Sequence, residues 1–138
     1  GHTLLLLDAT GSYHRESVRQ ATGSGLNVGT PLMRLQNPEE TRVVVVALAE
    51  TTPVQEATHL QEDLRRADIE PYAWVINRCL AATNTSDPIL RARAQAERRE
   101  LLRVAQEHAK RLYVVGWSAD EPTGIQALRD LMDGPDAT

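Results

Sequence analysis

Apolar and polar residues follow one another along the chain in blocks that predict a strand, then a helix, and then the same cycle again. Residues 43–48 read Val-Val-Val-Val-Ala-Leu, a β-branched run typical of a strand covered on both faces in a parallel sheet. Thr52 and Gln55 predict a capping box, with Pro53 at the first helical position. The apolar face of the helix that follows is predicted from spacings of three and four, at Val54, Ala57, Leu60, Leu64 and Ala67.

A second cycle begins after a turn at residues 69–71. Residues 72–77 predict a strand, and Asp87-Pro88 predicts the capped start of a long helix. The apolar stripe of this helix is predicted at Leu90, Ala94, Leu101, Ala105, Ala109 and Leu112. Its other face carries charged residues, which predict a solvated surface: Arg91, Arg93, Glu97, Arg98, Arg99 and Glu100.

The last cycle is shorter. Residues 112–115 predict a third strand, and Glu121-Pro122 predicts the start of a final helix that ends before Gly134-Pro135. Strands that alternate with helices predict an α/β fold: a parallel, doubly wound sheet with right-handed crossovers and flanking helices. With only three clear strands, we expect the sheet to be incomplete.

Two segments have no single predicted structure. Residues 3–8 are compatible with a strand or a helix by pattern alone. Residues 21–41 are rich in glycine, with a short apolar island at residues 31–35, and long loops inside a domain are usually functional or disordered.

Composition narrows the classes of function. The chain has 138 residues, enough for one domain, and 41% of them are hydrophobic with no Phe, so the core is expected to be aliphatic. A net charge of −4 and a pI near 5.5 argue against a nucleic-acid partner. Cys79 is the single cysteine, which excludes an internal disulfide and suits a reducing cytoplasm. Its place just after a predicted strand indicates a buried or half-buried thiol. No apolar run is long enough to span a bilayer.

Catalytic motifs are missing from the sequence. No Gly-x-x-x-x-Gly-Lys-Ser/Thr phosphate loop occurs, and the glycines at residues 23–29 neither follow a predicted strand nor stand near a lysine. The four histidines share no metal-ligand spacing, and there is no Gly-x-Ser-x-Gly nucleophile.

Ligands in open α/β sheets bind at the carboxyl ends of the strands. Asn77-Arg78-Cys79 ends the second predicted strand and Gly116-Trp117 ends the third. The amide of Asn77 can donate and accept at once, which suits the edge of a purine base, although a cap or turn asparagine fits the same pattern.

Several segments together resemble the arsenical pump-driving (arsenite-transporting) ATPase family. Gly-His-Thr at residues 1–3, and the residues that follow to Glu16, resemble the end of that family's switch II signature and the stretch after it. Similar landmarks in the C-terminal part of the second half of the duplicated bacterial enzyme correspond to residues 30–36, 50–54, 61–67, 73–77 and 121–124. The resemblance reaches to about Met132, so we expect residues 1–134 to be the C-terminal portion of an ATPase domain and 135–138 a disordered tail.

The resemblance implies an incomplete P-loop NTPase-type sheet, cut off within switch II from the phosphate loop. It implies a cytoplasmic parent ATPase that uses ATP and Mg²⁺, is activated by arsenite or antimonite, and drives a membrane efflux permease at the inner membrane. Asn77 matches the adenine-contacting asparagine, and His2 matches a metalloid ligand. The family usually has Gln where this chain has Arg78, and proline near the base where it has Gly116 and Trp117.

The same match predicts a helix beginning within residues 3–8. It predicts that this piece, lacking the catalytic residues, is inactive alone and associates with the rest of the ATPase chain or with itself through exposed strand edges. Two alternatives keep the fold: a non-catalytic protein-binding module related to the tail-anchored-protein targeting ATPases, with an apolar groove at residues 21–41, and a small regulatory α/β domain.

Overall fold

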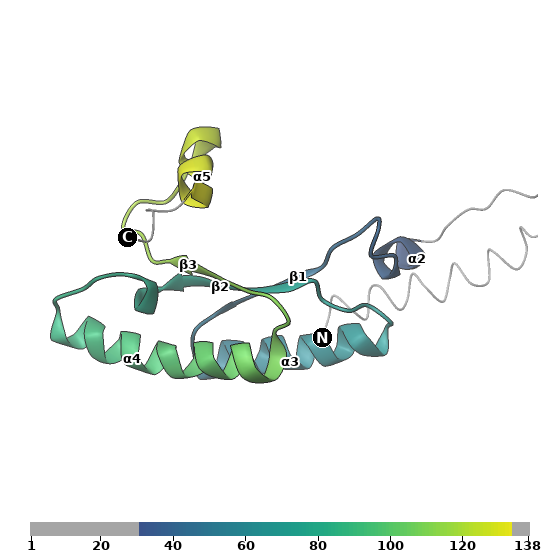
Figure 1. The fold of residues 1–138 in the computed structure, drawn as a ribbon, viewed down its shortest axis with the longest axis horizontal. Helices are drawn as coiled ribbons and strands as arrows, with labels where there is room; N and C mark the ends of the chain where they lie inside the picture. The colour runs from purple at the N-terminus through teal and green to yellow at the C-terminus, as the bar shows by residue number, and fades with distance from the viewer. Residues whose placement is uncertain (1–30, 134–138) are drawn as a thin grey trace, which may run out of the picture.

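The structure, a computed structural model, describes residues 31–133 (Figure 1). Its elements, in chain order, are α2 (Pro31–Gln36), β1 (Val44–Leu48), α3 (Thr51–Arg66), β2 (Ala73–Cys79), the 3-10 turn η1 (Leu80–Ala82), α4 (Pro88–Arg103), the π-helical turn η2 (Val104–His108), β3 (Leu112–Gly116) and α5 (Gly124–Asp133). All three predicted strands are present, each within two residues of its expected ends.

The strands form one parallel sheet in the order β1-β2-β3. Val46 of β1 stands opposite Val75 of β2, and Val75 stands opposite Tyr113 of β3. The predicted α/β architecture, a partial P-loop NTPase-type sheet with flanking helices, is therefore confirmed.

The prediction that β1 is covered on both faces is wrong for the described residues. Val45 and Ala47 are buried, whereas Val44 and Val46 on the opposite face are exposed, Val46 to 61%. The reason is the strand order. Right-handed crossovers that always step in the same direction place their helices on the same face, and only a reversal of direction winds helices onto the other. Figure 1 accordingly shows α3 and α4 together on one side of the sheet.

The core lies between this helical layer and the sheet. Its fully buried side chains are mostly aliphatic, as the composition predicts: Trp74, Ile76, Val45, Val54, Val104 and Cys79. The indole N–H of Trp74 donates to Gln61 Oε1 at 3.2 Å, and Gln61 Nε2 donates to the carbonyl of His108 at 3.0 Å. Buried polar groups are costly unless they are paired, and Gln61 pairs both of them while joining α3 to the end of η2.

The predicted helix starts have different outcomes. Asp87 caps α4 as predicted, since its side chain accepts from the backbone N–H groups of Ile89 and Leu90 at 2.8 and 3.0 Å. The capping box at Thr52 is wrong: α3 begins at Thr51, directly after Glu50, with no side-chain cap. Both residues make tertiary contacts with α4 instead, as described below. The last helix begins at Gly124, after the expected Glu121-Pro122.

The segment at residues 21–41 contains a short helix, α2, at the predicted apolar island. Leu32 and Leu35 pack against the core, and Gln36 Nε2 donates to the carbonyl of Ala67 at the end of α3. The expected helix at residues 3–8, His2 and the tail at 135–138 lie outside the described residues. Within residues 31–133, no helix combines the length and apolar character that crossing a bilayer requires.

Candidate functional site

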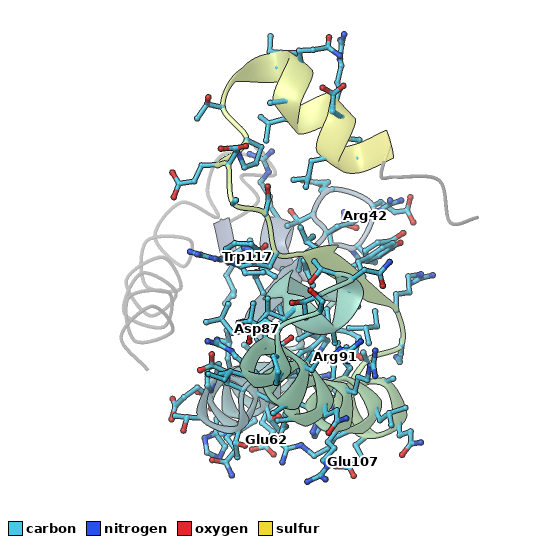
Figure 2. The ribbon with its side chains drawn as sticks, turned by 90° about the vertical axis from the view of Figure 1, so that its left-hand side faces the viewer. Arg42, Glu62, Asp87, Arg91, Glu107 and Trp117 are labelled. Carbon is cyan, nitrogen blue, oxygen red and sulfur yellow. The ribbon has the colours of Figure 1, made fainter. Side chains whose placement is uncertain are left out.

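The carboxyl ends of the three strands meet at one edge of the sheet, where β1 ends at Leu48, β2 at Cys79 and β3 at Gly116. Figure 2 looks toward this edge and shows Trp117 there, between the connection to α5 and the first turn of α4 with Asp87 and Arg91. Ligands of parallel sheets bind at such an edge, so the sequence-predicted residues lie where a ligand would be expected.

The end of β2 contains a β-bulge. Ile76 pairs with Val114 and Cys79 pairs with Gly116, so β2 takes three steps where β3 takes two, and the extra residue falls at Asn77–Arg78. Arg78 has φ = 54°, in the left-handed region that costs a non-glycine residue about 1–2 kcal/mol. Its backbone N–H donates to Asn77 Oδ1 at 2.9 Å. Bulges beside functional sites redirect side chains, and this one turns two consecutive polar residues out of the sheet.

Asn77 is exposed and stands opposite Leu48 of β1. Its Oδ1 closes the local turn with Arg78, which agrees with the turn interpretation of this asparagine. Among the described residues Asn77 Nδ2 has no hydrogen-bond partner, so both of its N–H donors and the second lone pair of Oδ1 can face a ligand. The two interpretations of Asn77 are therefore compatible.

Arg78 and Trp117 line the same hollow, of about 370 Å³, at the strand ends. Its other lining residues are Leu48, Ala49, Glu50, Leu80, Leu90, Arg93 and Glu97. Asn77 lines a neighbouring hollow of about 500 Å³ along the β1 edge, and Leu48 belongs to both. The structure thus brings Arg78 and Trp117 together and sets Asn77 beside them, across Leu48.

Trp117 is 42% exposed, and its backbone N–H donates to the carbonyl of Cys79 at 3.0 Å. Gly116 lies against η1: a Cβ at this position would meet Thr83 Cγ2 at 3.5 Å, an ordinary contact. A side chain as small as alanine would therefore fit at Gly116, which can contribute only backbone groups, whereas Trp117 contributes an exposed aromatic face.

The sequence did not predict that charged residues of α4 and of the β1 end would meet at this hollow. Arg93 Nη2 donates to Glu50 Oε1 at 2.7 Å, and its Nε lies 3.5 Å from Glu97 Oε1. In the same way, Thr51 Oγ1 donates to Glu100 Oε1 at 3.0 Å. These contacts attach the end of β1 and the start of α3 to α4, and Glu50, at the N-cap position of α3, pairs with Arg93 rather than with the backbone of its own helix.

Glu97 is the clearest correction. It was predicted on the solvated face of α4, yet it is only 3% exposed. Glu97 Oε2 accepts from the backbone N–H of Ala81 at 3.0 Å and from the Cys79 thiol at 3.4 Å. The spacing carried the signal, because Glu97 continues the buried stripe from Ala94 to Val104 at intervals of three and seven.

Cys79 is fully buried, as predicted. Burial raises the pKa of its thiol above the usual value, and the hydrogen bond to Glu97 raises it further. The thiol therefore keeps its proton at neutral pH, and its S–H group donates a hydrogen bond to the Glu97 side chain. Across residues 31–133, no three His, Cys, Asp or Glu side chains gather into a group that could hold a metal ion. The predicted metalloid ligand His2 lies outside that range.

Comparison with known proteins shows the family to which this chain belongs. The anion-transporting ATPase family matches residues 5–134. An arsenical pump-driving ATPase of Acidiphilium multivorum is 51% identical over 132 residues, which are 96% of this chain and 22% of the relative. An arsenical pump-driving ATPase of Escherichia coli is 51% identical over 131 residues, 95% of this chain and again 22% of the relative. The chain thus spans about a fifth of the length of these curated relatives.

Proposed function

Since the chain belongs to the anion-transporting ATPase family, we propose that its strand-end edge binds the adenine side of ATP. The bulge at Asn77–Arg78 is the observation that carries the proposal. A left-handed arginine at the end of a central strand is strained, and strain of this kind persists mainly where a functional geometry requires it. The edge of the sheet and the hollow in front of it supply the matching place for a ligand.

Each residue has a distinct role in this proposal. The exposed indole of Trp117 stacks on the base, and Arg78, which lines the same hollow, contributes its guanidinium beside it. Stacking of a base on an aromatic ring contributes about 1–3 kcal/mol and tolerates any base. Asn77 supplies selectivity, because an amide reads the donor and acceptor pattern of the purine edge. Gly116 would contribute only backbone groups at the end of β3.

For the longer protein, we extend the proposal to ATP hydrolysis that drives arsenite or antimonite efflux, since the relatives are named arsenical pump-driving ATPases. Phosphoryl transfer depends on a phosphate-binding loop and Mg²⁺, and this chain has no such loop. The 138 residues alone are therefore expected to be inactive, and the remainder of the ATPase chain would bind the phosphates and Mg²⁺. We place the protein in the cytoplasm, attached to the inner membrane through its efflux permease.

His2 is proposed as a metalloid ligand of the longer protein, since neutral imidazole nitrogen is a common ligand in such sites. His2→Ala should reduce the stimulation of ATP hydrolysis by antimonite and leave the unstimulated rate unchanged. His14→Ala, a second histidine of the same segment, is the matched control. Equal stimulation of the His2→Ala variant and the unaltered protein would remove this part of the proposal.

The base-side proposal is tested by comparing two ligands of the full-length ATPase: ATP, and inorganic tripolyphosphate, which has no base. Asn77→Ala should weaken ATP binding about tenfold, as loss of a hydrogen bond worth ~1.4 kcal/mol predicts, and leave tripolyphosphate binding unchanged. Asn84→Ala, at an exposed asparagine in the loop before α4, is the control. An equal effect on both ligands, or no effect on ATP, would contradict the proposal.

A further inference from the structure

Glu97 combines burial, charge and position in a way that the proposed binding residues do not explain. It belongs to α4 and is one of the residues that line the hollow, yet its side chain is only 4% exposed. A buried carboxylate is costly unless it is fully paired. Both carboxylate oxygens of Glu97 have partners. Oε2 accepts hydrogen bonds from the segment after the bulge, and Oε1 lies beside Arg93.

The two contacts of Oε2 bracket the turn that follows β2. The Cys79 thiol donates from the last residue of the strand, and the Ala81 N–H donates from the middle of η1. The carbonyl of Cys79 in turn accepts from Trp117. One carboxylate therefore fixes the backbone immediately after Arg78, and through Cys79 it also reaches the backbone that carries the indole.

Oε1 connects the same carboxylate to the end of β1. Arg93 contacts Glu97 Oε1 through its Nε and Glu50 Oε1 through its Nη2. Glu50 follows β1 and precedes α3 directly. The contacts from Glu50 to Arg93, from Arg93 to Glu97 and from Glu97 to Ala81 thus connect the ends of β1 and β2 through α4. Two of these contacts are charge-assisted hydrogen bonds and the third, between Arg93 and Glu97, is an ion pair. Such contacts hold a local backbone conformation more firmly than neutral ones do.

We propose that Glu97 is a positioning residue of the nucleotide site: its carboxylate holds residues 79–81 so that the strained Asn77–Arg78 bulge and Trp117 keep the arrangement that receives the base. This inference rests on the proposed function, because it assigns a role within that same site. Glu97 touches no ligand itself. It acts on base binding through the backbone of η1 and the end of β2.

The test uses the full-length ATPase and reads this site locally. Hydrogen exchange of the peptide covering residues 77–83, followed by mass spectrometry, gives the ATP concentration at which the segment is half protected. Glu97→Gln keeps an oxygen that can accept from the Ala81 N–H. Its amide NH₂ group, however, faces Arg93, and two donors cannot pair. The variant should raise the half-protection concentration on the order of tenfold, the usual size of an effect from an outer hydrogen-bond partner. Glu97→Leu, which removes every contact, should raise it further.

Two comparisons separate positioning from general stability. Glu100→Gln removes a carboxylate one turn along α4 that contacts Thr51 rather than η1, and it should leave the half-protection concentration unchanged. Tripolyphosphate should compete equally well for the phosphate-binding part of the site in the Glu97→Gln variant and the unaltered protein, because only base binding is affected. If Glu97→Gln does not yield folded protein, Glu97→Asp, which withdraws the charge by one methylene, gives the same reading.

The outcomes are distinct. If ATP protects the peptide and Asn77→Ala shifts the half-protection concentration while the Glu97 variants do not, the positioning role is wrong and the proposed function stands. If ATP gives no protection of this peptide in the unaltered protein, the proposed function is wrong as well. A parallel loss of ATP and tripolyphosphate binding in Glu97→Gln would mean a structural role only, and would also overturn the inference.

Discussion

The backbone N–H of Trp117 donates to the carbonyl of Cys79 at 3.0 Å, joining the end of β3 to the end of β2 just past the bulge. The sheet therefore does not simply stop at its carboxyl edge. The bulge places its extra residue at Asn77–Arg78, and β2 and β3 pair again at Cys79 and Gly116. Trp117 follows directly and lines the hollow at the strand ends. The position of the Trp117 backbone is therefore fixed by its hydrogen bond to β2 and not by contacts of the indole.

Arg78→Gly should separate stability from binding. Glycine adopts the left-handed region without a steric penalty, so the free energy of unfolding should stay constant or rise by up to ~1 kcal/mol. The same change removes the guanidinium from the hollow, so ATP affinity of the full-length protein should fall. Urea unfolding and nucleotide titration measure the two effects. A loss of stability would contradict the strained-bulge description.

Gln61 should be important for stability although it is polar. Gln61→Leu leaves the indole N–H of Trp74 and the carbonyl of His108 buried without partners, at a cost of about 1–3 kcal/mol for each group. Denaturant unfolding of the variant measures this loss. Gln55→Leu, the same exchange at an exposed position of α3, is the control and should change the unfolding free energy by less than about 0.5 kcal/mol. Equal losses of unfolding free energy in the two variants would contradict this role of the Gln61 hydrogen bonds.

Cys79 should react slowly with iodoacetamide in the folded chain and rapidly after unfolding, because the thiolate is the nucleophile and the pKa of this buried thiol is raised. A raised folded pKa contributes stability below the unfolded value, 9.0, and that contribution is lost as the pH rises through the folded pKa. Stability should therefore decline in alkaline solution, and less so in Cys79→Ala. Fast alkylation of folded protein would contradict the burial.

The sheet face opposite α3 and α4 should drive self-association of the 138-residue chain, since it exposes Val44, Val46 and Tyr113 together. Val46→Lys should lower the average mass measured by light scattering. Leu102→Lys places the same charge on α4 at a residue of similar exposure, 59%, and should have little effect. A monomeric unaltered chain at high concentration would count against this prediction.

The sequence predicted the elements better than their packing. Period and turn residues located the three strands of residues 31–133 and the cap at Asp87, because those signals are local. The one-sided burial of β1 depends on strand order, which the sequence of a single strand does not encode. Glu97 was assigned to solvent because charge outweighed its place in the buried stripe, and the left-handed Arg78 had no local signal such as glycine or asparagine. Asn77 and Trp117 are predicted from their places at strand ends, where ligands of open sheets bind, and their contact with a ligand stays a prediction.

The most direct test of the central claim is photolabelling of the full-length ATPase with 8-azido-ATP, whose reactive group sits on the base. The account predicts that the label is found in peptides containing residues 77–80 or 116–118, and that excess ATP prevents it, whereas excess tripolyphosphate reduces it only through competition for the phosphate site. Reproducible, ATP-protected labelling elsewhere in the chain, with none in these two segments, would contradict the assignment of the adenine side to this edge of the sheet.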